Sequence, residues 1–279
     1  PTFSSSFAFI VGYWHEIIPK SAFTFMLLPP LIFFSSYLNN EKYLIFLSIV
    51  IFFLGQQLFN GGLDGIVSLY FVTCCFCFYE IFLSNEKRNS GLYLILTLFF
   101  SISLTLIKNE GLALLSIIFL TTLLFKIFQK DKPKQLGSLI LLSLAFIPMI
   151  LWKLFCFKNN ISNDYINYSF FEQIFPRLFD IENYKIFFHY FIFSNEKIII
   201  AISIFLISFY LNFNRRLFYY CIFIFLLYLF IILIIHFATP MDFLHQLQTS
   251  SFRIVKTFSL FLGSFSILNL QNNKNKLNF

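Results

Sequence analysis

Long runs of apolar residues, separated by short polar segments, make up most of this chain. Each run is close to the ~17 to 25 residues that a helix needs to cross a ~30 Å hydrocarbon core. The pattern predicts an all-α, polytopic transmembrane helical bundle with about nine spans. The predicted spans are residues 22–38, 43–58, 66–83, 92–107, 112–128, 136–157, 198–213, 217–237 and 252–270.

We expect a single integral membrane domain over residues 1–279, because no polar stretch is long enough to fold alone. The aromatic N-terminal segment is expected at the outer interface, which Trp and Tyr favour. The expected divisions are an outer interfacial segment at 1–21, six spans at 22–157, a partly helical outer loop at 158–197, three spans at 198–270 and a cytoplasmic tail at 271–279.

Composition supports a membrane protein, since 58% of the residues are hydrophobic and 12% are charged, against about 25% charged in soluble domains. The net charge of +7 comes from Lys and Arg scattered over short connections. In such connections, Lys and Arg set the orientation of the membrane spans and do not form a continuous basic surface for nucleic acid. We therefore expect a lipid bilayer as partner and no nucleic acid. The cysteines lie inside apolar runs and are expected to pack as small hydrophobic residues, not to bind a metal.

The positive charges also predict an orientation, because cytoplasmic loops are enriched in Lys and Arg. Lys- and Arg-bearing connections alternate along the chain, which places its N-terminus outside and its C-terminus in the cytoplasm of a cell with an inner (plasma) membrane. A bacterial multispan protein seldom starts in this way, and the chain begins at Pro1 instead of Met. We therefore expect at least one further span upstream.

One charged segment, Lys108-Asn109-Glu110-Gly111, interrupts the apolar pattern. An ionised side chain at membrane depth costs roughly 2.5 to 3.5 kcal/mol even on insertion scales. Two interpretations remain open: a turn whose charges sit among lipid headgroups, or a charged pair at the mouth of a polar cavity.

Two further outer segments carry candidate chemistry. Asp64, between glycines, suits either a helix cap or a ligand-binding acid. The stretch 239–253 is dense in hydrogen-bonding groups and ends at Arg253, whose planar guanidinium can grip phosphate through two parallel hydrogen bonds. The five residues Asp64, Lys108, Glu110, His245 and Arg253 are predicted to converge on one outward-facing cavity.

Three motifs resemble the polytopic GT-C glycosyltransferases, in particular the bacterial branch related to protein mannosyltransferases and aminoarabinose transferases. They are the run LTLIKNEGL at 104–112, the loop GLDG at 62–65 before a helix with Leu69-Tyr70, and the pattern His245-x-x-x-Thr249-Ser250-x-x-Arg253. The resemblance spans roughly residues 60–260. It implies inverting transfer of a sugar from a polyprenyl-phosphate donor to a lipid, glycan or protein acceptor on the non-cytoplasmic face, as in cell-envelope assembly.

The resemblance also implies roles for the five residues. Asp64 matches the second acid of the family and, with Glu110, is expected to be catalytic or to bind the acceptor or a divalent metal ion. Lys108 and Arg253 are expected to neutralise the departing phosphate, and His245 to donate a hydrogen bond to the phosphate or the sugar.

The family's first catalytic acid lies in a loop that this chain largely lacks, where His15 or Glu16 is the available stand-in. An inactive fragment is therefore one alternative. Two other functions stay open: a multispan transporter or flippase, which would favour charges at the bilayer midplane in repeated halves, and an oligosaccharide polymerase or ligase, which would favour paired arginines in a large outer loop.

Overall fold

The computed structural model describes residues 9, 17–58, 63–84, 90–129, 134–159, 161, 170–239 and 242–274. Within these ranges the chain forms helices and no β-strand, which confirms the all-α prediction. His15, Glu16 and the glycines at 61 and 62 lie outside the described residues. Helix α2 begins at Ile17, inside the segment expected at the interface, and α13 runs on to Lys274, inside the expected tail.

Every predicted apolar run coincides with helical structure. The segments are α2 (Ile17–Tyr37), α3 (Asn40–Leu54), η1 (Gly55–Leu58), α4 (Asp64–Phe82), α5 (Ser90–Ile107), α6 (Asn109–Gln129), α7 (Lys134–Ser143), η2 (Leu144–Phe146), α8 (Ile147–Lys158), α9 (Phe170–Leu178), α10 (Ile181–Phe188), η3 (His189–Phe193), α11 (Glu196–Leu211), α12 (Arg215–Ala238) and α13 (Phe243–Lys274).

The expected number of spans is not confirmed. Within the described residues, five helices are long and apolar enough to cross a membrane, or six if the bent pair formed by 181–193 and 196–211 counts as one span. Short helices account for part of the difference. Helix α3, for example, has 15 residues, which at 1.5 Å per residue covers only about 22 Å.

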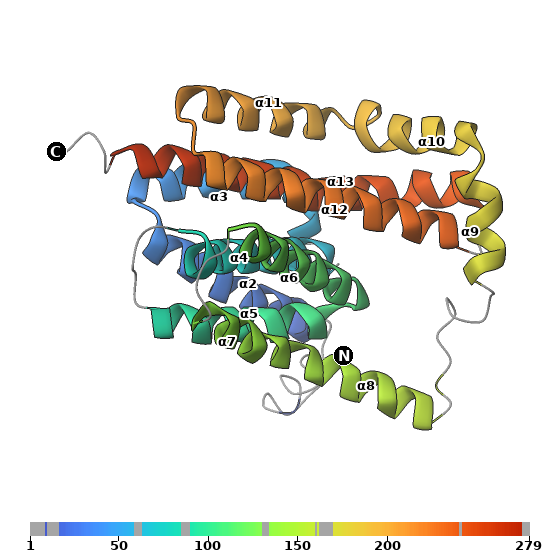
Figure 1. Ribbon diagram of the computed structural model, residues 1–279, viewed down its shortest axis with the longest axis horizontal. Helices are drawn as coiled ribbons and strands as arrows, with labels where there is room; N and C mark the ends of the chain where they lie inside the picture. The colour runs from blue at the N-terminus through green and yellow to red at the C-terminus, as the bar shows by residue number, and fades with distance from the viewer. Residues whose placement is uncertain are drawn as a thin grey trace.

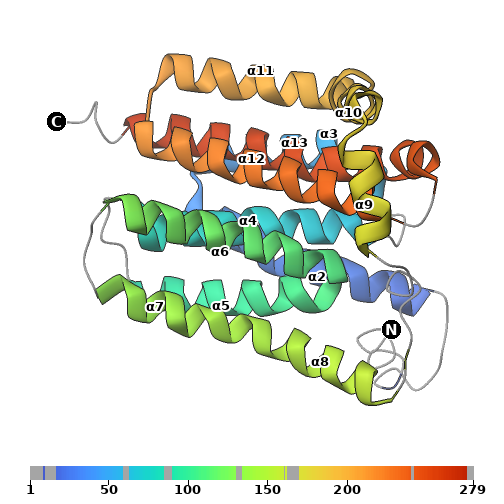
Figure 2. The same cartoon turned by 45° about the vertical axis from the view of Figure 1, so that its right-hand side comes forward.

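Helices α4 and α13 form the centre of the bundle. Of the apolar stretch of each helix, 94% is buried inside the protein in α4 and 83% in α13, against 22% to 39% in the other candidate spans. Figure 1 shows the long helices lying side by side, with α10 and α11 on one side of α12 and α13, and α5, α7 and α8 on the far side of α4 and α6. Figure 2 shows the same layers after a turn of the molecule.

Side chains along the α4–α13 contact explain why these two helices are buried. The hydroxyl groups of Ser68 and Thr257 share a hydrogen bond of 2.6 Å, and the rings of Phe76 and Phe265 pack with centroids 4.5 Å apart. The expected packing of the cysteines is confirmed for Cys74, Cys75, Cys77 and Cys221, which are buried free thiols.

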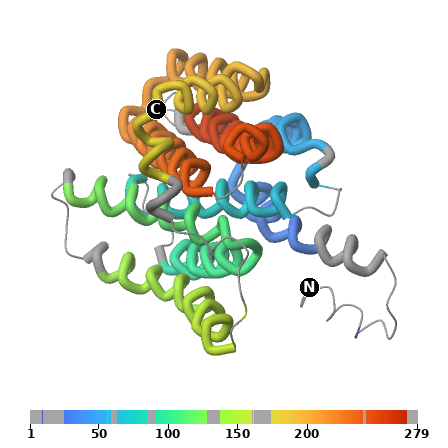
Figure 3. Tube along the Cα trace, turned by 90° about the vertical axis from the view of Figure 1, so that its right-hand side faces the viewer, coloured from blue at the N-terminus to red at the C-terminus, as the bar shows by residue number. Residues whose placement is uncertain are grey.

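The segment expected as a partly helical outer loop, 158–197, is mostly helical from residue 170 on, with breaks at 179–180 and 194–195. Helix α9 crosses the end of the bundle steeply (Figures 1 and 3). Helix α10 and the π-helical turn η3 then meet α11 at an angle of 70°. Phe187 and Phe191, one turn apart, are fully buried, which explains why this aromatic stretch packs onto the bundle.

Gly111 permits a very tight connection between α5 and α6. A Cβ atom at this position would lie 1.9 Å from the carbonyl oxygen of Leu104, far inside contact distance. The Gly111 N–H also donates to the Lys108 carbonyl oxygen at 2.8 Å. The glycine therefore lets α6 start directly against the end of α5, and that start fixes the positions of Lys108 and Glu110.

We expect Gly111→Ala to lower the melting temperature of the purified protein strongly. The added methyl group collides with backbone instead of a movable side chain, and overpacking typically costs about 1 to 3 kcal/mol or more. Gly137→Ala is the matched control, since nothing lies within 4 Å of a Cβ there. Equal melting temperatures for the two variants would contradict the tight α5–α6 connection.

Candidate functional site

Asp64 is the first residue of α4, at the end of the bundle where α5 and α12 end and α6 and α13 begin. A carboxylate is favoured there because the N-terminus of a helix carries a partial positive charge. Leu63 occupies the N-cap position without a side-chain cap. The Asp64 carboxylate instead accepts a hydrogen bond from Lys108 Nζ at 2.7 Å, and its other oxygen lies 3.5 Å from Arg253 Nη1.

Lys108 lies between the two carboxylates of the site. Its Nζ is 2.7 Å from Asp64 Oδ1 and 3.0 Å from Glu110 Oε1. Burial by itself lowers the pKa of Lys108, but the hydrogen bonds and charges of Asp64 and Glu110 outweigh it, so the pKa is raised above its ordinary value. Lys108 therefore stays charged at neutral pH, and both Lys108 and Glu110 line a cavity.

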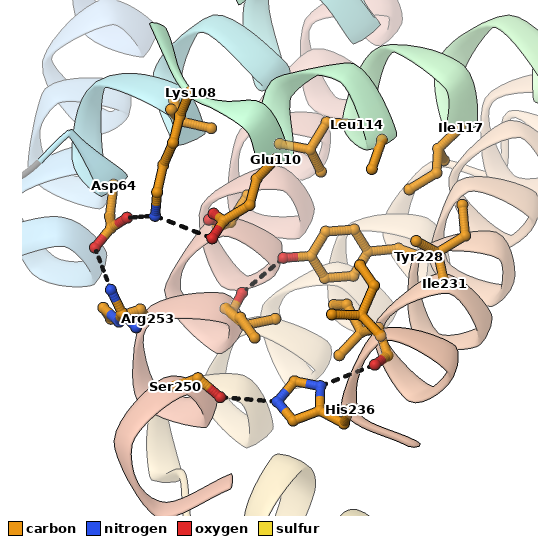
Figure 4. A pocket seen from close by; sticks show the side chains of 16 residues that line it. Asp64, Lys108, Glu110, Leu114, Ile117, Tyr228, Ile231, His236, Ser250 and Arg253 are labelled. Atoms are coloured by element: carbon orange, nitrogen blue, oxygen red, sulfur yellow. Dashed lines mark hydrogen bonds and ion pairs between the residues drawn. The ribbon is translucent and has the colours of Figure 1, made fainter. Parts of the chain in front are cut away.

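The cavity itself has a volume of about 90 Å³, room for several water molecules. Its polar side carries Asp64, Lys108, Glu110 and Arg253 (Figure 4). The opposite side is apolar and consists mainly of branched side chains from α6 and α12. These include Leu114, Ile117, Ile231, Ile232 and Ile235. The lining thus divides into a charged side and an apolar side.

Exposure differs among the four charged side chains. The Asp64 side chain is 19% exposed and Lys108 28%, whereas Arg253 is 48% and Glu110 58% exposed. Asp64 thus lies deepest, between two cations, while Glu110 and Arg253 lie nearer the mouth. The N–H groups of Arg253 that do not face Asp64 are geometrically suited to an incoming anion.

His236 and Ser250 also line the cavity, although the sequence did not single them out as a pair. His236 is 2% exposed. Its Nε2 lies 2.8 Å from Ser250 Oγ, and its Nδ1 lies 2.8 Å from the carbonyl oxygen of Ile232 (Figure 4). One signal was available: a lone ionisable residue inside the apolar run 217–237 marks a functional candidate by default.

His245 lies outside this site. It is exposed, and its backbone N–H donates to Asp242 Oδ1 at 2.8 Å, at the start of α13. The expected convergence of five residues therefore holds for four of them. The physical reason is helical phase: His245 precedes Ser250 by five residues, which turns it about 140° around the helix from the cavity-facing side.

The described residues contain no cluster of side chains arranged to bind a metal ion. No three His, Cys, Asp or Glu side chains are grouped to hold an ion within the described ranges. The two carboxylates of the site instead share Lys108. Asp64 and Glu110 are the oxygen ligands that a divalent ion would use if it bound at the polar side.

No protein-family model matches the chain, and neither curated proteins nor solved structures gave a similar protein. The class follows from the structure alone. The described chain is an all-helical protein with five or six helices suited to a lipid bilayer and a charged cavity at one end of the bundle.

The raised pKa of Lys108 predicts how stability depends on pH. A raised folded-state pKa means that the ion-pair contribution is complete below the ordinary value of 10.5 and is lost as the pH rises through the folded value. The difference in melting temperature between wild type and Asp64→Asn should thus be constant from neutral pH to about pH 10 and shrink above it.

Glu182→Gln provides the control, because it removes the exposed pair between Glu182 and Lys185. Exposed pairs are screened by solvent, so its effect should be smaller at every pH. An Asp64→Asn difference that stays constant or grows up to pH 12 would contradict the pairing of Asp64 with Lys108.

Proposed function

We propose that this protein is a membrane glycosyltransferase that moves a sugar from a polyprenyl-phosphate donor to a lipid, glycan or protein acceptor. The observation that carries the proposal is the cavity's division into a charged side with two cations and an apolar side, on helices suited to a bilayer. A lipid-linked sugar phosphate has the same division into an anionic head and an apolar chain.

The cations suit the leaving group of such a reaction. When the bond from the sugar to the phosphate breaks, negative charge grows on the phosphate, and fixed cations stabilise it most in a site with little water. Arg253 is half exposed and reaches Asp64 only at 3.5 Å, so its fork of donors can turn to the phosphate. Lys108 adds a second positive charge on the other side of Asp64, deeper in the cavity than Arg253.

The carboxylates take different parts in the proposed site. Asp64 lies between Lys108 and Arg253 and fixes both cations. Glu110 is more exposed, at the mouth, where its carboxylate is placed to accept hydrogen bonds from sugar hydroxyl groups. In this proposal, the cavity mouth opens to the non-cytoplasmic side, since Lys and Arg gather on the connections at the other end of the bundle.

The first test is binding, which requires no knowledge of the sugar. Purified protein in lipid nanodiscs should bind undecaprenyl phosphate more tightly than undecaprenol, because only the phosphate meets the cations. Arg253→Gln should weaken phosphate binding about tenfold or more, since a hydrogen bond to a charged group contributes about 1.5 to 3 kcal/mol. Native mass spectrometry measures all of these affinities.

Arg215→Gln is the matched control. Arg215 starts α12 at the opposite end of the bundle, against the Tyr219 ring. Equal losses for the two arginine variants, or equal affinities for phosphate and alcohol, would count against the site. Release of undecaprenyl phosphate from a lipid-linked sugar then separates a transferase from a flippase, which moves its lipid intact.

A further inference from the structure

The imidazole of His236 has a defined tautomer when it is neutral. Nδ1 lies 2.8 Å from the Ile232 carbonyl oxygen, which can only accept a hydrogen bond, so Nδ1 carries the proton. Nε2 is then left with a lone pair. That lone pair faces Ser250 Oγ, 2.8 Å away, so the serine hydroxyl can donate its proton to the imidazole.

Ser250 has a second acceptor within reach. Its Oγ lies 2.7 Å from the carbonyl oxygen of Gln246 on the previous turn of α13. If His236 gains a proton at Nε2, that N–H donates to Ser250 Oγ and the serine hydroxyl turns to Gln246. The same three groups thus satisfy both the neutral and the charged imidazole, as a group that gains and loses a proton requires.

The other proton acceptors of the cavity are already committed. Asp64 is paired with Lys108 at 2.7 Å and with Arg253 at 3.5 Å, and a proton on its carboxylate would break these ion pairs. Glu110 also pairs with Lys108 and lies at the mouth. His236 is buried and paired with neutral groups.

Neighbouring elements fix the geometry of His236 and Ser250. Arg177 from α9 donates to the Thr239 carbonyl oxygen at 2.7 Å and lies 3.3 Å from that of His236, so it holds the end of α12. Arg253 follows Ser250 by three residues, on the same face of α13. A serine hydroxyl beside a base that a third group fixes, with a cation nearby, matches the general arrangement that activates serines.

We propose that His236 and Ser250 form a proton-accepting dyad, an inference that rests on the proposed function for its substrate. The acceptor hydroxyl gives its proton to Ser250 Oγ as the serine proton moves to His236 Nε2. The acceptor oxygen forms a bond to the anomeric carbon, and the bond from that carbon to the phosphate oxygen breaks. The phosphate leaves with the electron pair, and water at the cavity mouth later takes the proton from His236.

The test uses diisopropyl fluorophosphate, a small reagent that reacts with activated serines. Ser250 Oγ bonds to phosphorus, fluoride leaves and His236 takes the proton. Full-length protein in liposomes should carry the adduct on Ser250, located by peptide mass spectrometry, and Ser250→Ala should lose it. His236→Gln should slow labelling about 100-fold or more, the range of general-base contributions.

Two controls separate this dyad from a structural hydrogen bond. Thr249 is exposed on the same turn and bonds to the His245 and Gln246 carbonyl oxygens, so Thr249→Ala should leave the labelling of Ser250 unchanged. His245→Gln removes an exposed imidazole and should do the same. If His236→Gln does not fold, His236→Asn, which keeps an amide donor for Ile232, replaces it.

An unlabelled Ser250 in the wild type, or labelling that is as fast without His236, overturns the dyad. Release of undecaprenyl phosphate from a lipid-linked sugar is measured in the same liposomes. Labelling of Ser250 without release of undecaprenyl phosphate would support the dyad and contradict sugar transfer. Release of undecaprenyl phosphate without labelling of Ser250 would contradict the dyad and support the transferase.

Discussion

The ion pairs of Asp64 with Lys108 and Arg253 connect the segments that meet at the charged end of this molecule. They join the start of α4, the α5–α6 connection and α13, three segments far apart in the sequence. A charge that is partly removed from water is stable only when an opposite charge and hydrogen bonds replace the water. Each of these residues therefore depends on the others, and the deepest, Asp64, fixes the two cations that the proposed phosphate would meet.

The helix framework determines which groups can reach the cavity. Gly111 brings the start of α6 against α5 and so places Lys108 between two carboxylates. The buried contact of α4 with α13 brings Asp64 and Arg253 to the same end of the bundle. The wall opposite these charges stays apolar because α6 and α12 turn branched aliphatic side chains toward it. Charge and hydrophobic surface thus meet in one cavity, which is the basis for proposing an amphipathic substrate.

The sequence was sufficient for the helices and for four cavity residues, for identifiable reasons. Charges at Lys108 and Glu110 stand out in an apolar chain, and alternate connections of a helical bundle share an end, which groups Asp64 with Arg253. His245 could not be assigned, because the phase of α13 depends on where that helix begins. His236 was not predicted, although a histidine inside an apolar run is itself a signal of function. The nine spans are not confirmed within the described residues, because helix length and burial, set by packing, do not follow from hydrophobicity alone.

A double-mutant cycle on Asp64 and Lys108 tests the central ion pair most directly. Asp64→Asn, Lys108→Met and the double variant are unfolded in a bilayer mimetic, and their unfolding free energies are compared with the wild type. If the residues are paired, each single variant deprives the remaining charge of its partner at 2.7 Å, so the double variant is destabilised less than the sum, by about 0.5 to 3 kcal/mol. Effects that add within about 0.5 kcal/mol would show that the two residues act independently, and the proposed site would lose its foundation.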